Sequence, residues 1–114
     1  MDMNIDKLVA EHVMGWDYSI RSYFMPTADM NHTLQVIEKL KTLGFNTLLR
    51  NCVSEDCGLV KNGEATREDY FCSISIGSVY TEKFWFKTVT KSPQMAVCLS
   101  ALKAVGFIGV INND

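Results

Sequence analysis

The stretch that decides the fold is residues 90–106, TKSPQMAVCLSALKAVG. Ser92 can accept a hydrogen bond from a free backbone N–H of a first helical turn, and Pro93 is tolerated at the first helical position. Gly106 can adopt the left-handed conformation that ends a helix. The segment therefore predicts a helix over 93–105. Because nearly all of its residues are apolar, this helix needs a sheet and other helices to bury it.

Upstream, apolar residues at helical spacing predict a short amphipathic helix over residues 4–14. Asp2 or Asn4 can cap its start, and Gly15 can end it. The aromatic and β-branched residues of 16–26 then predict an extended, partly packed connection.

A second upstream helix is predicted over residues 28–43 by the same spacing. Thr27 is its expected N-cap, and Gly44 is expected to end it.

Three strands are predicted between the second helix and the last one. Residues 70–77 alternate well between apolar and polar side chains, residues 83–89 follow the same pattern, and residues 45–52 alternate loosely. The connection 77–82 is short enough for a hairpin. The polar segment 53–69 is longer than the loops of compact domains usually are.

These elements predict an α+β fold, a single-domain sandwich in the order α-α-β-β-β-α with a three-stranded antiparallel meander. Phe84 and Phe86 are expected on an apolar sheet face covered by the helices 28–43 and 93–105. The first helix is expected away from this apolar face, and it could lie on the opposite face, which carries Trp85.

Composition restricts the possible classes of protein. A chain of 114 residues with 47% apolar residues can bury one core, so residues 1–114 are expected to form one domain. A net charge of −2 argues against a general affinity for nucleic-acid backbones or anionic membranes. Neither a signal peptide nor an apolar run of about 18 residues is found, so a cytoplasmic protein is expected.

Four cysteines are expected to remain reduced in that compartment. Cys72 and Cys98 are predicted to be small core residues, and Cys52 and Cys57 are predicted to lie on or near a loop. Their spacing, taken with His12 and His32, matches no common zinc pattern, so no metal site is predicted.

Nothing in the chain predicts an enzyme. It has no glycine-rich phosphate loop and no pair of carboxylates in a known signature, and no nucleophile can be paired with His12 by sequence. We therefore expect neither catalysis nor a cofactor.

Two groups of aromatic and basic residues are candidates for binding an anionic aromatic ligand. One group lies in the 16–26 connection, and the other lies on the less apolar sheet face with Lys87, Ser73 and Ser75. The alternatives are that Trp16 packs the first helix against the sheet, and that the Trp85 face is an interface with that helix or with another subunit. The six candidate ligand-binding residues are Trp16, Tyr18, Arg21, Arg50, Lys83 and Trp85.

Three stretches of the sequence resemble the phage ABA-sandwich domain family. They are IDKLVAEHVMGW (residues 5–16), FMPTAD (24–29) and SPQMAVCLSALKAVG (92–106). The resemblance covers nearly the whole chain, although the 53–69 loop is longer than the family's connection. It implies a phage origin and a compact sandwich of helices and strands, and it brings no catalytic residues with it.

The functional hypothesis is a non-enzymatic phage counter-defence protein. It would sequester a nucleotide-derived immune signal in the host cytosol as a homo-oligomer. The apolar tail 107–111 could add a strand to the sheet or dock on a second copy. The alternative is a module that binds a host protein or double-stranded RNA, because the order of elements matches a double-stranded RNA-binding domain. Lys87 and Lys91 are too few for that domain's lysine cluster, so nucleic acid is not the expected partner.

Overall fold

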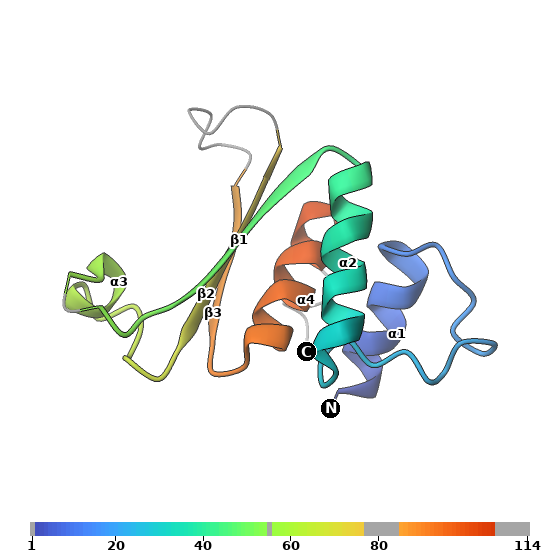
Figure 1. The fold of residues 1–114 in the computed structure, drawn as a ribbon, viewed down its shortest axis with the longest axis horizontal. Coiled ribbons are helices and arrows are strands. Elements are labelled where there is room, and N and C mark those ends of the chain that lie inside the picture. Colours follow the sequence, from blue (N-terminus) through green and yellow to red (C-terminus); the bar gives the residue numbers. More distant parts are fainter. Residues whose placement is uncertain (1, 55, 77–84, 107–114) are drawn as a thin grey trace.

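The structure is a computed structural model that describes residues 2–54, 56–76 and 85–106. These residues form an α+β fold in the predicted order, with a three-stranded antiparallel sheet whose strands are neighbours in sequence order (Figure 1). Lys83, Phe84, the predicted hairpin 77–82 and the predicted docking tail 107–111 lie outside the described residues. The elements are α1 (Met3–His12), α2 (Met30–Thr42), β1 (Phe45–Asn51), α3 (Gly58–Lys61), β2 (Tyr70–Ile76), β3 (Trp85–Thr90) and α4 (Pro93–Ala104).

Helix α4 is the centre of the fold, and both its ends are formed as the sequence predicts. The Ser92 hydroxyl accepts a hydrogen bond from the Met95 N–H at 3.1 Å, Pro93 occupies the first turn, and Gly106 follows the helix with a φ of +94°. Helix α4 contacts all three strands and both long helices. Six of its residues are fully buried: Ala96, Val97, Cys98, Ser100, Ala101 and Leu102.

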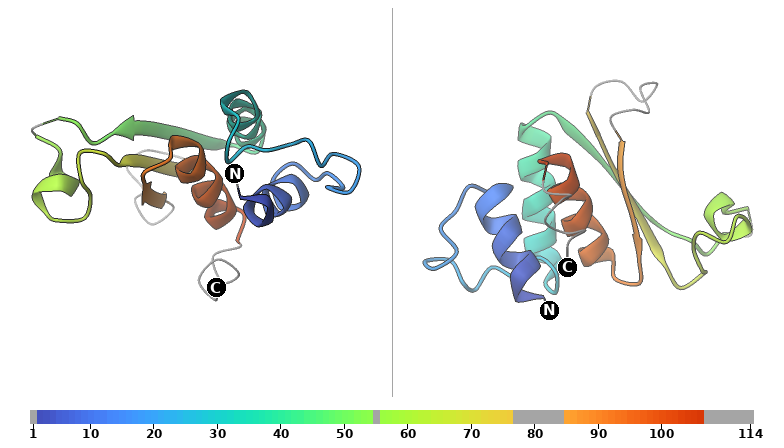
Figure 2. Two further views of the ribbon diagram at one scale, coloured as in Figure 1. Left: turned by 90° about the horizontal axis from the view of Figure 1, so that it is seen from below. Right: turned by 180° about the vertical axis from the view of Figure 1, so that it is seen from behind.

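Helix α1 does not cover the second face of the sheet, which was one possible position for it. Its buried residues, which include Ile5 and Val9, join the main core, and its helical neighbour is α4. Figure 1 shows α4, α2 and α1 on the same side of the sheet, and the view from behind in Figure 2 shows the same arrangement. An amphipathic stripe predicts that a helix is buried, but α4 and the sheet both offer apolar surface to it.

Helix α2 begins at Met30, and Asp29 caps it instead of the predicted Thr27. The Asp29 carboxylate accepts a hydrogen bond from the Asn31 N–H at 2.9 Å. The backbone carbonyl of Met25 accepts hydrogen bonds from the N–H groups of Ala28 and Asp29, so a turn precedes the helix. The turn delays the start of the helix by two residues.

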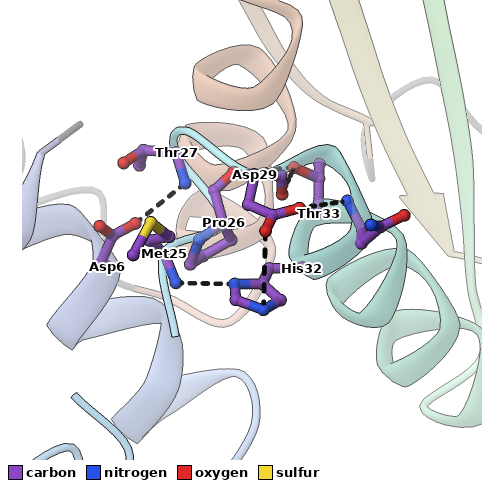
Figure 3. Close-up of polar contacts among 8 residues, drawn as sticks. Asp6, Met25, Pro26, Thr27, Asp29, His32 and Thr33 are labelled. Atoms are coloured by element: carbon purple, nitrogen blue, oxygen red, sulfur yellow. Dashed lines mark hydrogen bonds and ion pairs between the residues drawn. The ribbon is translucent and has the colours of Figure 1, made fainter. Parts of the chain in front are cut away.

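Thr27 instead connects the turn to helix α1. Its N–H donates to Asp6 Oδ1 at 2.9 Å, and its hydroxyl accepts from the Asp2 N–H at 2.9 Å. Figure 3 shows the hydrogen bond from Thr27 to Asp6 beside a second one, in which the Met25 N–H donates to Nδ1 of His32 at 3.0 Å. The turn is therefore fixed to both helices by side chains that are distant in sequence.

The carboxyl group of Asp6 is fully buried in this network. Its Oδ2 atom has no hydrogen-bond partner among the residues that the structure describes. Burial raises the pKa of the Asp6 carboxyl above 3.8, and the hydrogen bonds from Thr27 offset only part of this effect.

We expect the Asp6→Asn variant to lose a pH-dependent part of the stability. A raised pKa in the folded state means that folding favours the protonated carboxyl, so this contribution grows as the pH falls through the folded pKa toward 3.8. This contribution to stability is lost as the pH rises through the folded-state pKa. Urea unfolding of both proteins at several pH values measures the effect. The wild type should gain stability relative to the variant with acidification, and a difference that stays constant would contradict the assignment.

Helix α3 lies inside the predicted 53–69 loop and was not predicted. It has only four residues, so it carries no helical periodicity that sequence analysis can detect. Its residues Leu59 and Val60 pack on a second, smaller core with Cys52, Cys57, Ala65 and Phe71. In Figure 1, α3 lies on the side of the sheet that is opposite to the other helices.

Candidate functional site

One face of the sheet has no long helix against it among the described residues. Alternation along the strands sets its side chains apart from that of Thr88, whose hydroxyl accepts a hydrogen bond from Ser100 of α4. The strand register places three side chains from each strand on this surface, which we call the open face. Its members are Asn46, Leu48 and Arg50 on β1, Phe71, Ser73 and Ser75 on β2, and Trp85, Lys87 and Val89 on β3.

The register arranges these nine residues as three rows across the strands. Ser75 lies between Asn46 and Trp85, and Ser73 lies between Leu48 and Lys87. In the third row, Phe71 lies between Arg50 and Val89. The central strand therefore offers two small hydroxyl side chains in the middle of the face.

A hollow of about 260 Å³ lies over these serines. The two serines are buried, at 6% and 8% exposed, whereas Leu48 beside them is 55% exposed. Apolar ring and aliphatic surface dominates the walls of the hollow. The walls are formed by Leu48, Phe71 and Trp85, with Asn46 at the edge.

Two cations flank the aromatic rings of the open face. The Arg50 guanidinium lies 5.6 Å from the ring centre of Phe71, and the Lys87 ammonium lies 5.2 Å from that of Trp85. Both side chains are exposed. Neither forms an ion pair with a carboxylate in the part of the chain that the structure describes. A protein of net charge −2 thus carries two positive charges and no acidic residue on this face.

Trp85 presents ring carbon to the hollow. Its Nε1 atom is buried without a hydrogen-bond partner among the described residues, while the side chain as a whole is half-buried. The exposed part of the residue is therefore apolar ring surface, which is what a stacking ligand needs.

The other three candidate residues lie on the connection between α1 and α2 and are engaged within the protein. The Arg21 guanidinium lies 4.4 Å from the ring centre of Trp16, and the same ring meets Phe24 edge to face at 4.9 Å. Tyr18 packs against the main core, and burial raises the pKa of its hydroxyl. These contacts join Trp16 to Phe24 and Arg21 of the same connection, and they do not pack the first helix against the sheet, which was the alternative for this residue.

The structure therefore does not bring the six candidates into one site. Trp16, Tyr18 and Arg21 belong to the connection between α1 and α2, which Figure 1 shows on the far side of the helices from the sheet, whereas Arg50 and Trp85 belong to the open face. Lys83 lies outside the described residues. Sequence analysis did not propose Phe71, Leu48 or Asn46 as lining residues. Leu48 and Asn46 could have been found from the sequence, because they lie two and four residues before Arg50 and therefore share its face of the first strand.

A second hollow, of about 420 Å³, lies on the outer surface of α2. Met14 and Leu34 provide apolar surface there, and Glu38 and Lys39 provide opposite charges. It is lined by no aromatic side chain and has no excess of positive charge, so it fits an anionic aromatic ligand less well than the open face does.

No metal site is found in the described part of the chain, where no three His, Cys, Asp or Glu side chains gather. His12 is exposed. Cys72 and Cys98 are fully buried in the main core, which confirms the expectation for both.

The alternative of double-stranded RNA binding gains little from the geometry. Lys91 lies just before α4, where that class of domain holds phosphate, but its Nζ lies 3.4 Å from Glu68 Oε2. The carboxylate reduces the positive charge that this end of the helix could offer to a phosphate group.

Comparison with known proteins finds no family model, no curated protein and no solved structure that matches this chain. The resemblance to the phage ABA-sandwich domain therefore stays a prediction. Among the described helices, the longest has 13 residues, and none is long and apolar enough to cross a membrane.

Proposed function

We propose that this protein binds a nucleotide-type ligand on the open face and holds it without chemical change. The observation that carries the proposal is the hollow between Phe71 and Trp85, flanked by the exposed cations Arg50 and Lys87. A flat base and a phosphate group need aromatic surface and positive charge side by side.

The spacing of the strands suggests how such a ligand lies. Its base stacks on Trp85 over the serines, and the side chain of Lys87 is one row away, at about 7 Å along the strand. Arg50 lies one row further, across the sheet, where it can bind a second phosphate or a ribose. A hollow of about 260 Å³ is slightly smaller than the usual site for a drug-sized molecule, so it suits one base with its phosphates outside.

Sequestration is the role that fits these residues. The nine side chains of the open face include no carboxylate, histidine or cysteine, so this surface offers no general acid or base for neutral pH. We propose, on the resemblance to phage proteins, that the ligand is a nucleotide-derived immune signal of a host cell and that the protein is a counter-defence factor in the host cytosol. We also propose that the protein acts as a homo-oligomer.

Native mass spectrometry of the purified protein tests ligand binding directly. We propose a panel of cyclic mononucleotides, cyclic dinucleotides and ADP-ribose, with adenosine and inorganic phosphate as controls that each lack one half of the ligand. A bound mass for a nucleotide that neither control gives supports the proposal. If no member of the panel binds, and Trp85→Ala converts a dimer to a monomer, the open face is an interface between subunits and the proposal is wrong.

Co-purification of RNA or of a host protein in the same spectra would favour the alternative module. The two outcomes differ in mass and in sensitivity to nuclease, so one sample distinguishes them.

A further inference from the structure

The smaller core contains two free thiols that lie side by side. Cys52 follows β1 and Cys57 precedes α3, and both are buried, at 0% and 4% exposed. Each thiol takes part in a hydrogen bond with the other. The sulfur atoms are thus close together in a cluster that is separate from the main core.

Backbone hydrogen bonds fix both cysteines in this position. The Cys52 N–H donates to the carbonyl of Asp69 at 3.1 Å, and the Cys57 N–H donates to the carbonyl of Ser54 at 3.1 Å. These bonds hold the backbone of both cysteines beside the small cluster that contains their side chains.

The two thiols have different chemical environments. Hydrogen bonds from the backbone N–H groups of Val60 and Leu59 lower the pKa of the Cys57 thiol, and the Arg50 charge adds to this effect. Burial raises the pKa of the Cys52 thiol, and its hydrogen bond with Cys57 raises it further. Cys57 is thus the better nucleophile and Cys52 its neutral neighbour.

A metal is a poorer explanation for this pair than redox chemistry. A structural zinc ion needs four ligands, and no group of three ligating side chains occurs among the described residues. Two adjacent thiols with unequal pKa values are instead the usual arrangement of a thiol and its resolving partner.

We propose that Cys52 and Cys57 are a redox-active pair that closes to an intramolecular disulfide when the protein meets a peroxide. The Cys57 thiolate attacks one oxygen of hydrogen peroxide, the O–O bond breaks, and the hydroxide released takes a proton and leaves as water. Cys57 becomes a sulfenic acid. The Cys52 sulfur then attacks the Cys57 sulfur, the S–O bond breaks, and the hydroxyl group leaves as a second water with the Cys52 proton.

The overall reaction is balanced: two thiols lose two electrons in total, and one peroxide molecule is reduced to two waters. Among the described residues, the apolar side chains packed around the pair come from the 52–65 segment, from Phe71 and from Val89. A small oxidant reaches the pair when this covering opens. Most residues of that segment are exposed, and it contains only the four-residue helix α3, so its local opening costs little compared with unfolding of the main core.

The pair does not depend on the proposed ligand, although the two sites meet at Phe71. This residue packs in the cysteine cluster and also lines the hollow of the open face. Peptide mapping reads the disulfide without any nucleotide, so failure of one proposal is distinguishable from failure of the other.

The test uses the wild-type protein, treated with hydrogen peroxide under native conditions and mapped by mass spectrometry after blocking of free thiols. We expect a loss of two hydrogen atoms and a linked peptide that joins Cys52 to Cys57. Cys72 and Cys98 are internal controls that should stay thiols, because burial raises the pKa of Cys72 to about 11 and that of Cys98 further. Cys52 and Cys57 left unlinked, or a disulfide that involves Cys72, Cys98 or a second chain, would overturn the proposal.

Single variants test the order of the two steps. In Cys52→Ser, peroxide should leave a sulfenic acid on Cys57 that dimedone traps, whereas Cys57→Ser should give little trapping at Cys52. Iodoacetamide should label Cys57 in the reduced wild type at least about tenfold faster than Cys98. Equal rates, or trapping mainly at Cys52, would contradict the assignment of Cys57 as the nucleophile.

Discussion

The Leu102→Ala variant should lose about 2–5 kcal/mol of unfolding free energy, the largest effect on stability that we expect from one substitution. Leu102 is fully buried on α4, the helix that contacts all three strands and both long helices. Truncation leaves a cavity where these layers meet, and the surrounding helices and strands can close it only in part. Urea unfolding followed by circular dichroism measures the loss, which is a large share of the stability of a domain of this size.

The matched control is Leu99→Ala, on the same helix. The sequence predicts that both leucines are buried, but Leu99 is only half-buried in the structure. Its truncation should therefore cost less, about 1–2 kcal/mol. Equal losses for the two variants, or a loss below about 1 kcal/mol for Leu102→Ala, would contradict the central place of α4.

Trp85→Ala and Arg50→Ala should each weaken nucleotide binding by about 1–3 kcal/mol, the largest functional effects that we expect. The first removes a stacking surface and the second a charge-assisted hydrogen bond. Isothermal titration calorimetry with the tightest-binding nucleotide of the panel measures both. Arg50 is exposed, so its variant should melt close to the wild type. Trp85→Phe keeps an aromatic ring and should restore most of the binding that Trp85→Ala loses.

Arg21→Ala is the matched control for Arg50→Ala. Both arginines are exposed and lie over an aromatic ring, but Arg21 lies over Trp16 in the connection between α1 and α2. Its removal should leave the affinity unchanged. Loss of binding in Arg21→Ala together with normal binding in Arg50→Ala would move the site from the open face to the connection.

The parts of the fold that the sequence predicts correctly depend on local chemistry. Ser92 caps α4 through a bond three residues away, and the alternation of β2 separates Cys72 and Ile74 from Ser73 and Ser75. Short-range rules of this kind do not depend on the rest of the chain.

The parts that the sequence predicts wrongly depend on distant contacts. Thr27 has the chemistry of an N-cap, but Asp6, 21 residues earlier, holds its backbone in a turn. Helix α1 has an apolar stripe that fits either side of the sheet, and only the packing of α4 decides between them. One sequence alone shows neither which contact Thr27 makes nor which side of the sheet α1 takes.

The candidate site shows the same limit. An arginine near a tryptophan predicts equally well a pair that binds a ligand and a pair that packs within the protein. Arg21 lies over Trp16 in the connection between α1 and α2, whereas Arg50 is on a sheet face that no long helix of the described chain covers. The distinction required the position of α1, which the sequence does not determine.

The most direct test of the central claim, that the open face holds a nucleotide, is a titration of the ¹⁵N-labelled protein followed by backbone amide shifts. With the tightest-binding nucleotide of the panel, we predict the largest shifts in the central rows of the sheet, at Leu48, Ser73, Ser75, Trp85 and Lys87. The amide chemical shifts of residues 16–24 should not change. Shifts confined to residues 16–24, or to the α2 hollow at Met14 and Leu34, would contradict the claim.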